Sequence, residues 1–315
     1  MTTDLGTRAD TSRASTPRYE TIQTRGLKFE VLTAGSGDKL ALLLHGFPEC
    51  AHSWRAQIPK LVELGYRVWA PNLRGYGHTE RPKGVKNYTL EMLDGDVSDL
   101  IDASGASSVL LVGHDWGGAV AWDYAMHGTR PIDKLVVMNC PHPAQFKKGL
   151  TTAAQLKRSW YMFLFQLPVL PEALLGHDRA KVLSEVFRTQ AVHPENLSDA
   201  DIDVFRNNAS IPGALTTMVN YYRALFRGLV RGEMRRGVPI KVPTLLIWGE
   251  KDIALGKELV PGTERYVRDL TVRYIPDASH WVQQDAPETV NQLLEEWLQP
   301  KPEQLSVKDV AGPSQ

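Results

Sequence analysis

The sequence predicts an α/β protein that has a mostly parallel central sheet, helices on both faces and a helical segment inserted into it. Short apolar runs with the length of buried strands alternate with segments that have helical spacing. This alternation stops at residue 141 and resumes after residue 240, and no run between them is typical of a central strand. Such alternating units build a parallel sheet, because each helix carries the chain back to start the next strand in the same direction.

The N-terminal half supplies the first strands and helices. Residues 1–18 contain few large apolar groups, so we expect a disordered tail there. The expected strands are 29–33, 40–44, 66–70, 109–112 and 135–138, and the expected helices are 54–64, 90–103 and 119–128. Since parallel strands end at the same edge of a sheet, the loops that follow these strands should lie together there.

Residues 141–240 are predicted to form a helical cap, or lid, domain. Aromatic and aliphatic segments with helical spacing fill this stretch, and prolines separate them. The core domain then comprises residues 19–140 and 241–299, and its second part contains two further expected strands and a final helix, at 244–248, 271–275 and 286–298. Residues 300–315 are expected to be a flexible tail.

Composition narrows the possible partners. The chain has 315 residues, and 43% of them are hydrophobic, which is enough for one large core or for a core and a smaller unit. Its 36 Lys and Arg residues balance its 36 Asp and Glu residues, so no net charge favours nucleic acid or an anionic membrane. No apolar run has the length of a membrane span. Cys50 and Cys140 form neither a disulfide framework nor a zinc site, so we expect a cytoplasmic protein.

The segment around Asp115 predicts a nucleophile. An apolar strand ends at Gly113, and residues 113–117 have the pattern Gly-x-Asp-x-Gly before a helix begins. In this pattern the turn is so tight that its central residue is strained and its side chain stands above the sheet. The free N–H groups and the dipole at the start of a helix favour a carboxylate at that position. For this segment alone, an aspartate that merely caps the helix is the alternative interpretation.

Two further candidates follow predicted strands later in the chain. Asp252 and His280 come after Asp115 in the order nucleophile, acid, histidine that is typical of a hydrolase triad. Taken singly, Asp252 could be a turn residue and His280 a structural one. Together with the turn at Asp115 they predict a charge relay, and the rival carboxylates Glu250 and Asp277 are assigned to turns or solvent.

The other histidines are assigned structural roles. His45 and His114 flank the expected reaction centre, where we expect them to hold loops through hydrogen bonds to the backbone. The remaining histidines show no metal-ligand spacing. The sequence therefore predicts neither a metal nor a cofactor.

Several motifs resemble those of the epoxide hydrolases that have the α/β-hydrolase fold. The motifs are His45–Glu49, Gly113–Gly118, Asn139–Pro143, Tyr161, Asn220–Arg223, Trp248–Asp252 and Ser279–Trp281. The resemblance extends from about Tyr19 to Leu298, which is nearly the whole of the chain between the two expected tails. It implies that Asp115 is the nucleophile and that Asp252 and His280 form the charge relay.

The resemblance also implies the groups that surround the nucleophile. The backbone N–H groups of Phe47 and Trp116 would form the oxyanion hole, and the Phe47–Pro48 peptide bond would be cis. Tyr161 and Tyr222 would hold the epoxide oxygen, and these two tyrosines, with Phe47, Pro48 and Trp116, would bind the substrate. The alternative interpretation of the tyrosines is that they are core aromatics on amphipathic helices.

The residue types fit this chemistry. A carboxylate that attacks an sp³ carbon forms an alkyl ester, which suits the opening of a strained epoxide ring. The departing oxygen needs a proton, and a phenol can donate one while remaining neutral in an apolar cavity. Water activated by His280 would then hydrolyse the ester on Asp115 and release a vicinal diol. Four aromatic residues of the cap, Trp160, Phe163, Phe165 and Phe226, are expected to line the substrate cavity, which favours an apolar or aryl epoxide as the substrate.

Alternative functions make different demands on the sequence. A dehalogenase also uses an aspartate and Trp116 is compatible with it, but Phe47 stands where a halide-binding Asn is expected, and the tyrosines would be unnecessary. A ligand-binding protein on an inactive hydrolase scaffold should lack a triad member, and none is missing. A serine esterase is excluded by Asp115. The expected partners are a small apolar epoxide and water, and a homodimer is left open because some cap aromatics could face a second subunit.

Overall fold

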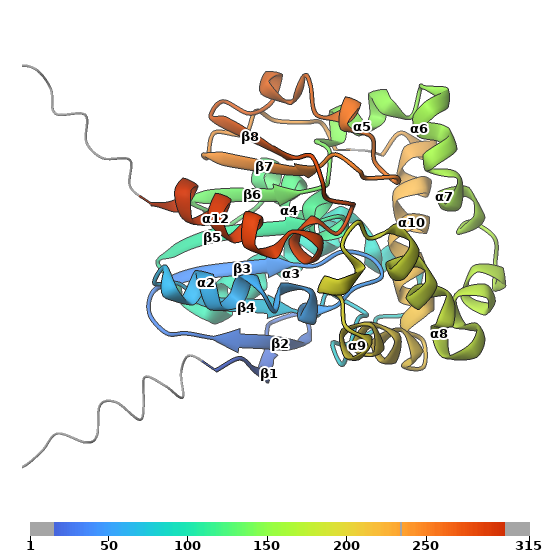
Figure 1. Ribbon diagram of the computed structural model, residues 1–315, viewed down its shortest axis with the longest axis horizontal. Coiled ribbons are helices and arrows are strands. Elements are labelled where there is room, and N and C mark those ends of the chain that lie inside the picture. The colour runs from blue at the N-terminus through green and yellow to red at the C-terminus, as the bar shows by residue number, and fades with distance from the viewer. Residues whose placement is uncertain (1–15, 234, 300–315) are drawn as a thin grey trace, which may run out of the picture.

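Eight strands form a single central sheet in the computed structural model, which describes residues 16–233 and 235–299 (Figure 1). The strands are β1 (Arg18–Gln23), β2 (Lys28–Ala34), β3 (Lys39–Leu44), β4 (Arg67–Pro71), β5 (Ser108–His114), β6 (Lys134–Met138), β7 (Thr244–Gly249) and β8 (Leu270–Ile275). Their order across the sheet is β1-β2-β4-β3-β5-β6-β7-β8. The β1–β2 and β2–β4 pairs are antiparallel and the other five are parallel, so the sheet is mostly parallel, as predicted.

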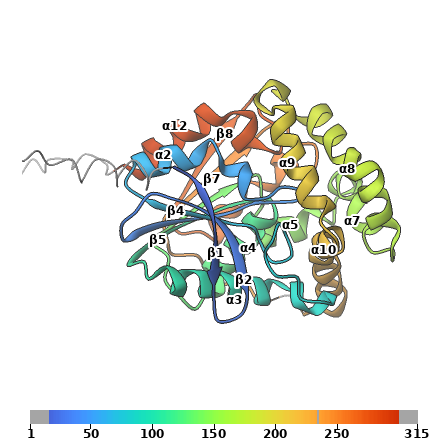
Figure 2. The same cartoon turned by 90° about the horizontal axis from the view of Figure 1, so that it is seen from below.

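Helices cover both faces of this sheet (Figure 2). One face carries α2 (Gln57–Glu63) and α12 (Pro287–Leu298), and the other carries α3 (Leu90–Ser104) and α4 (Trp116–His127). The shorter helices of the core are η1 (Ala51–Trp54), η2 (Val85–Tyr88), η4 (Lys257–Leu259), η5 (Thr263–Arg265) and α11 (Val282–Asp285). None of the helices in the described part of the chain is long and apolar enough to cross a membrane.

The buried strands are apolar on both sides because each face of the sheet packs against helices. In β3, Leu42 belongs to the core beneath α3 and α4, and its neighbour Leu43 belongs to the core beneath α2 and α12. Leu111 and Val112 of β5 divide in the same way. Each such side chain contributes about 1.5–3 kcal/mol when it leaves water, so the continuous apolar runs of the sequence become the rigid centre of the fold.

A helical insertion lies between β6 and β7, at the carboxyl ends of the parallel strands (Figure 1). It comprises α5 (Pro143–Gly149), α6 (Ala153–Arg158), α7 (Trp160–Leu164), α8 (Leu170–Gln190), η3 (Pro194–Asn196), α9 (Asp199–Ser210) and α10 (Ala214–Arg231). The backbone of α8 leaves the helical conformation at residues 177–180, so α8 consists of two helical parts. The predicted insertion is therefore confirmed, and the division into core and cap domains stays a prediction.

Most of the two expected tails lies outside the described residues, which exclude residues 1–15 and 300–315. The first strand, β1, begins at Arg18, one residue before the predicted start of the core.

Candidate active site

The turn between β5 and α4 holds Asp115 in a backbone conformation that few residues adopt. Its φ of 50° and ψ of −117° lie outside the regions that residues with a side chain normally occupy. The turn also brings backbone against backbone, since a Cβ atom at Gly117 would lie 2.0 Å from the carbonyl oxygen of Leu44. A Cβ atom at Gly113 would lie 2.3 Å from the carbonyl oxygen of Gly117. Glycine is therefore required at both positions for the strand to turn directly into the helix.

Replacement of Gly117 tests this steric argument. We expect Gly117→Ala to lower the free energy of unfolding by about 3 kcal/mol, because the added methyl group meets the backbone of a central strand that cannot move aside. Urea unfolding followed by tryptophan fluorescence measures the change. Gly95→Ala on α3 is the matched control, because its Cβ atom meets nothing within 4 Å and alanine is favoured in a helix. Equal stability of the two variants would contradict the argument.

His280 lies between the carboxylates of Asp115 and Asp252. Its Nδ1 atom is 2.7 Å from Oδ2 of Asp252, and its Nε2 atom is 3.4 Å from Oδ2 of Asp115. The backbone N–H of Phe47, in the loop after β3, donates a hydrogen bond of 2.7 Å to Oδ1 of Asp115. The Asp252 side chain is inaccessible to solvent, whereas that of Asp115 is 15% exposed. This is the arrangement of a nucleophile, a base and an acid that orients the base.

His280 and Asp115 shift each other's pKa toward the charged form. Burial alone would lower the pKa of His280, but the Asp252 carboxylate and the contact with Asp115 outweigh it and raise this pKa well above its ordinary value. Burial would likewise raise the pKa of Asp115, but His280, His114 and the Phe47 N–H hold it below its ordinary value. The resting site therefore contains an ionised aspartate beside a protonated histidine.

A small, mainly apolar cavity of about 90 Å³ adjoins the Asp115 side chain. Tyr161 on α7 and Tyr222 on α10 line it together with Asp115 and Trp116. The two tyrosine rings contact each other edge to face, with centroids 5.8 Å apart. Burial, with a further contribution from nearby charges, raises the pKa of both phenols, so both remain protonated and able to donate a hydrogen. The cavity thus holds an anionic nucleophile and two neutral proton donors.

The comparisons with known proteins agree with this site. Residues 41–287 match the family described as the alpha/beta hydrolase fold. Epoxide hydrolase 3 of Xenopus tropicalis is 41% identical to the chain over 290 residues, which cover 89% of this chain and 77% of that protein. Epoxide hydrolase 4 of Homo sapiens is 39% identical over 284 residues, which cover 88% and 77%. The chain belongs to the epoxide hydrolases of the α/β-hydrolase fold.

A solved structure supports this assignment independently. It is a variant of an epoxide hydrolase from Bacillus megaterium, complexed with its product, a naphthyloxy-propane-1,2-diol. Its TM-score against this chain is 0.80 at 30% sequence identity, and the alignment covers 89% of this chain and 99% of that one. The likeness includes the helical insertion as well as the sheet, since almost the whole of the solved chain is matched.

In this member of the epoxide hydrolases, the two predicted groups of the oxyanion hole differ in their contacts. The Phe47 N–H reaches Asp115, whereas the backbone N–H of Trp116 makes no hydrogen bond to it among the described residues. The Phe47–Pro48 peptide bond is cis, as the resemblance implies. Neither residue of that bond lines the cavity, and the Phe47 ring packs against Tyr222 and Phe165 instead. The substrate contacts assigned to Phe47 and Pro48, and the role of Trp116, stay predictions.

The expectation that four cap aromatics line the substrate cavity of this family member is wrong. Trp160 is 62% exposed and Phe163 is 50% exposed, so both point away from the cavity. Phe165 is buried behind Tyr222, and Phe226 packs against Phe163. The cap side of the cavity consists instead of the two tyrosines and aliphatic side chains, and its lining residues include Met162, Leu225, Leu229 and Leu255.

Buried hydrogen bonds hold the loops that carry the triad. His114 lies 2.8 Å from the carbonyl oxygen of His280 through Nε2, and the backbone N–H of Leu73 donates to Nε2 of His45 at 3.1 Å. The predicted role of both histidines as loop anchors is confirmed. Glu49 has a role that was not predicted: its buried carboxylate lies 2.8 Å from Nδ1 of His114 and so fixes that ring.

Asn139 is a second residue with a role that was not predicted. It follows β6, and its Nδ2 atom donates to Oδ2 of Asp252 at 2.8 Å, while its Oδ1 atom accepts from the backbone N–H of Gly249 at 2.8 Å. The backbone N–H groups of Ala254 and Leu255 donate to the other oxygen of Asp252. Asp252 is therefore fixed from both sides, and so is the imidazole that it orients.

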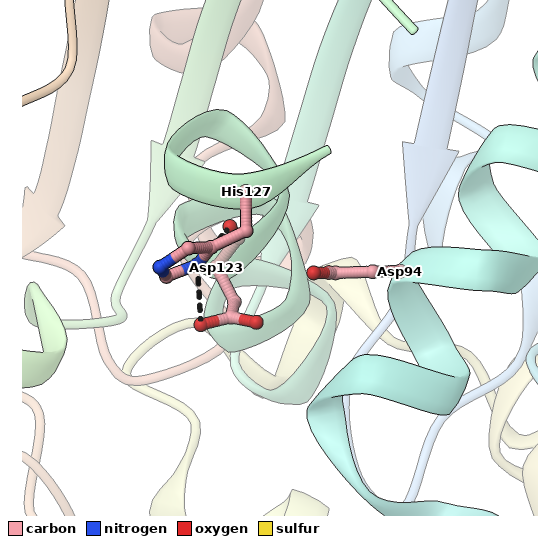
Figure 3. A group of neighbouring side chains, drawn as sticks. All are labelled: Asp94, Asp123 and His127. Carbon is pink, nitrogen blue, oxygen red and sulfur yellow. Dashed lines mark hydrogen bonds and ion pairs between the residues drawn. The ribbon is translucent and has the colours of Figure 1, made fainter. Parts of the chain in front are cut away.

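Among the described residues, one group of side chains outside the active site has the spacing of metal ligands (Figure 3). Asp94 of α3 faces Asp123 and His127 of α4, and their ligand atoms lie within 4.8 Å of one another. Arg235, after α10, donates to Asp94 at 2.5 Å and to Asp123 at 2.7 Å. Burial and the charge of Asp123 raise the pKa of Asp94 to about 8. The guanidinium supplies the positive charge that the two carboxyls require, and it ties the end of the insertion to the core.

Proposed function

We propose that this protein hydrolyses an apolar epoxide to a vicinal diol through an alkyl ester formed on Asp115. The observation that carries the proposal is the position of that carboxylate. It lies within hydrogen-bond distance of the Phe47 N–H, is 3.4 Å from His280, and lines the same apolar cavity as Tyr161 and Tyr222. Membership of the epoxide hydrolases supports the same reaction.

The first step opens the epoxide ring. A carboxylate oxygen of Asp115 attacks a ring carbon, and the bond between that carbon and the epoxide oxygen breaks. The departing oxygen takes a proton from Tyr161 or Tyr222, which becomes a phenolate. This step needs no base, because Asp115 is already ionised at rest, and it leaves the protein with a covalent ester and one free hydroxyl on the bound substrate.

The second step hydrolyses the ester. Neutral His280 takes a proton from water, and the water oxygen bonds to the carboxyl carbon of Asp115. The Phe47 N–H already points at this carboxyl group, so it stabilises the negative oxygen of the tetrahedral intermediate. The bond to the substrate oxygen then breaks, and that oxygen takes the proton from His280. The proton left on Asp115 returns to the phenolate, so the cycle consumes one epoxide and one water.

The formation of the ester also prepares its own hydrolysis. The charge of Asp115 and its contact with His280 are two of the causes that keep the imidazole protonated at rest. Esterification removes that charge, so the pKa of His280 falls and the ring releases its proton to solvent. When hydrolysis restores the Asp115 carboxylate, the ring takes a proton back from solvent, so the cycle has no net proton change. The histidine thus becomes a base only after the nucleophile has reacted.

This coupling predicts how the ester intermediate depends on pH. Ring opening should be insensitive to mild acid, because the pKa of Asp115 is lowered and the carboxylate stays ionised. Hydrolysis needs neutral His280, so it slows as the pH falls below the pKa of that group in the ester. The fraction of protein present as ester during turnover should therefore be larger at about pH 5 than at about pH 8. Acid quenching followed by intact-protein mass spectrometry measures that fraction, and a fraction that rises with pH would contradict the scheme.

A direct test separates this activity from that of a dehalogenase. The protein is incubated with styrene oxide and, separately, with 1-bromobutane, and the diol and bromide are assayed. Diol without bromide is the expected result, and bromide without diol would reject the proposal. In a single turnover in heavy-oxygen water, the label should enter the Asp115 carboxyl group before it enters the diol, because water attacks the carboxyl carbon.

The substrate class and the cellular compartment are also part of the proposal. The solved relative holds an aryl diol as its product, and the cavity here is mainly apolar, which supports an apolar epoxide as the substrate. Cys50 and Cys140 are both buried and free, which is consistent with the reducing cytoplasm as the compartment. A homodimer stays a prediction.

A further inference from the structure

The outer side of the helical insertion exposes a concentrated apolar surface. Fourteen large hydrophobic side chains are exposed in the described part of the chain, and seven of them lie between residues 156 and 174. Single exposed apolar side chains are ordinary in proteins, but a group of them marks a surface that an apolar partner covers. These seven side chains are called the apolar edge below.

Four members of the apolar edge form one stripe along α6 and α7. They are Leu156, Trp160, Phe163 and Leu167. Their spacing of four, three and four residues is that of a single helical face. All five residues of α7 are apolar or aromatic, and Met162 on its other side is buried. A helix that is apolar all round needs an apolar medium on both sides, and the protein supplies only one of them.

The other three members lie in the connection from α7 to α8 and on the first turns of α8. They are Val169, Leu170 and Leu174. Val169 is 74% exposed and has a φ of 66°, a conformation that a β-branched residue rarely adopts. Arg223 of α10 fixes this connection, because its guanidinium donates to the carbonyl oxygen of Leu167 at 2.7 Å and to the Glu172 carboxylate at 2.6 Å. The apolar connection is therefore held in an outward position.

The position of the apolar edge leaves it open to a large partner. Figures 1 and 2 place α7 and α8 on the side of the insertion that faces away from the sheet. The start of β1 and the end of α12 lie on the opposite side of the molecule (Figure 1). A partner that covers the apolar edge therefore does not have to displace the core.

Basic side chains border the apolar edge at both of its ends. Residues 147–181 contain six Lys and Arg residues but two Asp and Glu residues, whereas the whole chain has 36 of each kind. Five of these cations are exposed and make no hydrogen bond or ion pair with other described residues: Lys147, Lys148, Lys157, Arg179 and Lys181. Glu172 is bound by Arg223, so Asp178 is the one carboxylate of this segment that has no cationic partner in the described structure.

An apolar surface with a basic border matches the boundary layer of an anionic lipid bilayer. Trp and Phe side chains favour the zone between headgroups and acyl chains, and Lys and Arg bind the anionic headgroups. A second copy of this chain fits less well, because a symmetric contact would bring two basic borders together with few carboxylates to neutralise them. The local charge thus favours a lipid surface over a dimer.

We infer that the apolar edge docks this protein on an anionic lipid surface. The contact is peripheral, since none of the helices in the described part of the chain is able to cross a membrane. The inference goes beyond the proposed function, because none of the seven side chains lines the catalytic cavity. Docking and catalysis can therefore be measured separately.

The test measures how the full chain partitions onto vesicles in a flotation assay. One set of vesicles is phosphatidylcholine with about one third phosphatidylglycerol, and the other is phosphatidylcholine alone. The unmodified protein should float with the anionic vesicles and bind the uncharged ones more weakly. Trp160→Ser/Val169→Ser should lower the partition constant about tenfold or more, because both side chains leave water on docking. Lys157→Gln and Lys181→Gln should each lower it about fivefold, the effect of one cation near an anionic surface.

Tyr19→Ser and Lys28→Gln are the matched controls. Both residues are exposed, but they lie on β1 and β2, outside the apolar edge and its basic border, so binding should not change. Circular dichroism checks that every variant is folded.

Three results would overturn the inference. The first is a protein that binds neither kind of vesicle, and the second is binding that the variants of the apolar edge and of its border weaken no more than the controls do. The third is a dimer in light scattering that Trp160→Ser/Val169→Ser converts to a monomer while vesicle binding is absent, which would assign this surface to a second copy of the chain.

Discussion

His280→Gln should trap the protein as a covalent ester. Glutamine is polar and occupies a similar volume, but it cannot accept a proton from water as a base does. Asp115 still receives the hydrogen bond from the Phe47 N–H in this variant, and His114 also still favours its ionised form, so it can still attack the ring. Ring opening should therefore proceed, and hydrolysis of the ester should nearly stop.

The expected loss in steady-state turnover is a factor on the order of 10²–10⁴, the usual contribution of a general base. The variant is mixed with styrene oxide, quenched in acid and weighed by mass spectrometry. One substrate mass should be added to each molecule of protein, and digestion should place it on the peptide that contains Asp115.

Two further variants make this result specific. His78→Gln removes an exposed histidine away from the site and should turn over normally without an adduct. Asp115→Asn/His280→Gln should give no adduct, because it lacks the nucleophile. Normal turnover by His280→Gln with no added mass would show that the histidine is not the base and would remove the second step of the mechanism.

The sheet was largely predictable, because the sequences of buried parallel strands are unbroken runs of apolar residues. The run that became β5 ends at Gly113, where backbone contact with Gly117 leaves room for nothing larger than glycine. The strand β1 was not predicted, and its burial explains why. Most of its residues are exposed or half-buried, so it has no apolar run, and it is held mainly by backbone pairing with β2.

The meeting of Asp115, Asp252 and His280 was predictable from their order in the chain, whereas the directions of the cap side chains were not. Asp115, Asp252 and His280 each follow a strand, and parallel topology brings the ends of such strands together whatever the loops do. Trp160 and Phe163 lie on α7, which has five residues. So short a helix has too few residues for hydrophobic periodicity to show which side is buried, and only packing against α10 determines it.

Glu49 and Asn139 show a second limit on what can be predicted from the sequence. Each is a polar side chain in the loop that follows a buried strand, which was a usable signal, but the partner of each comes from a distant part of the chain. Glu49 reaches His114, and Asn139 reaches Asp252, 113 positions later. A buried polar group must find a partner, yet the sequence does not name that partner until the strand order is known.

The tyrosines should control the first step. In Tyr161→Phe/Tyr222→Phe the ring-opened oxygen has neither phenol as a proton donor, and the cavity around it is mainly apolar. Ring opening should slow by a factor on the order of 10²–10⁴. The fold should be retained, because both aromatic rings remain, and the change removes only the hydrogen bonds of these hydroxyls with each other and with Trp116.

The rate at which the ester accumulates measures ring opening alone when hydrolysis is stopped by His280→Gln. The triple variant Tyr161→Phe/Tyr222→Phe/His280→Gln should acquire the substrate mass much more slowly than His280→Gln does. Each single tyrosine variant should fall between the two, because one phenol still lines the cavity. Tyr266→Phe, which removes a phenol that lies outside the cavity and stacks on His142, should behave as the unmodified protein. Rapid ester formation in the triple variant would mean that the departing oxygen obtains its proton elsewhere, and the assignment of the two phenols would then be wrong.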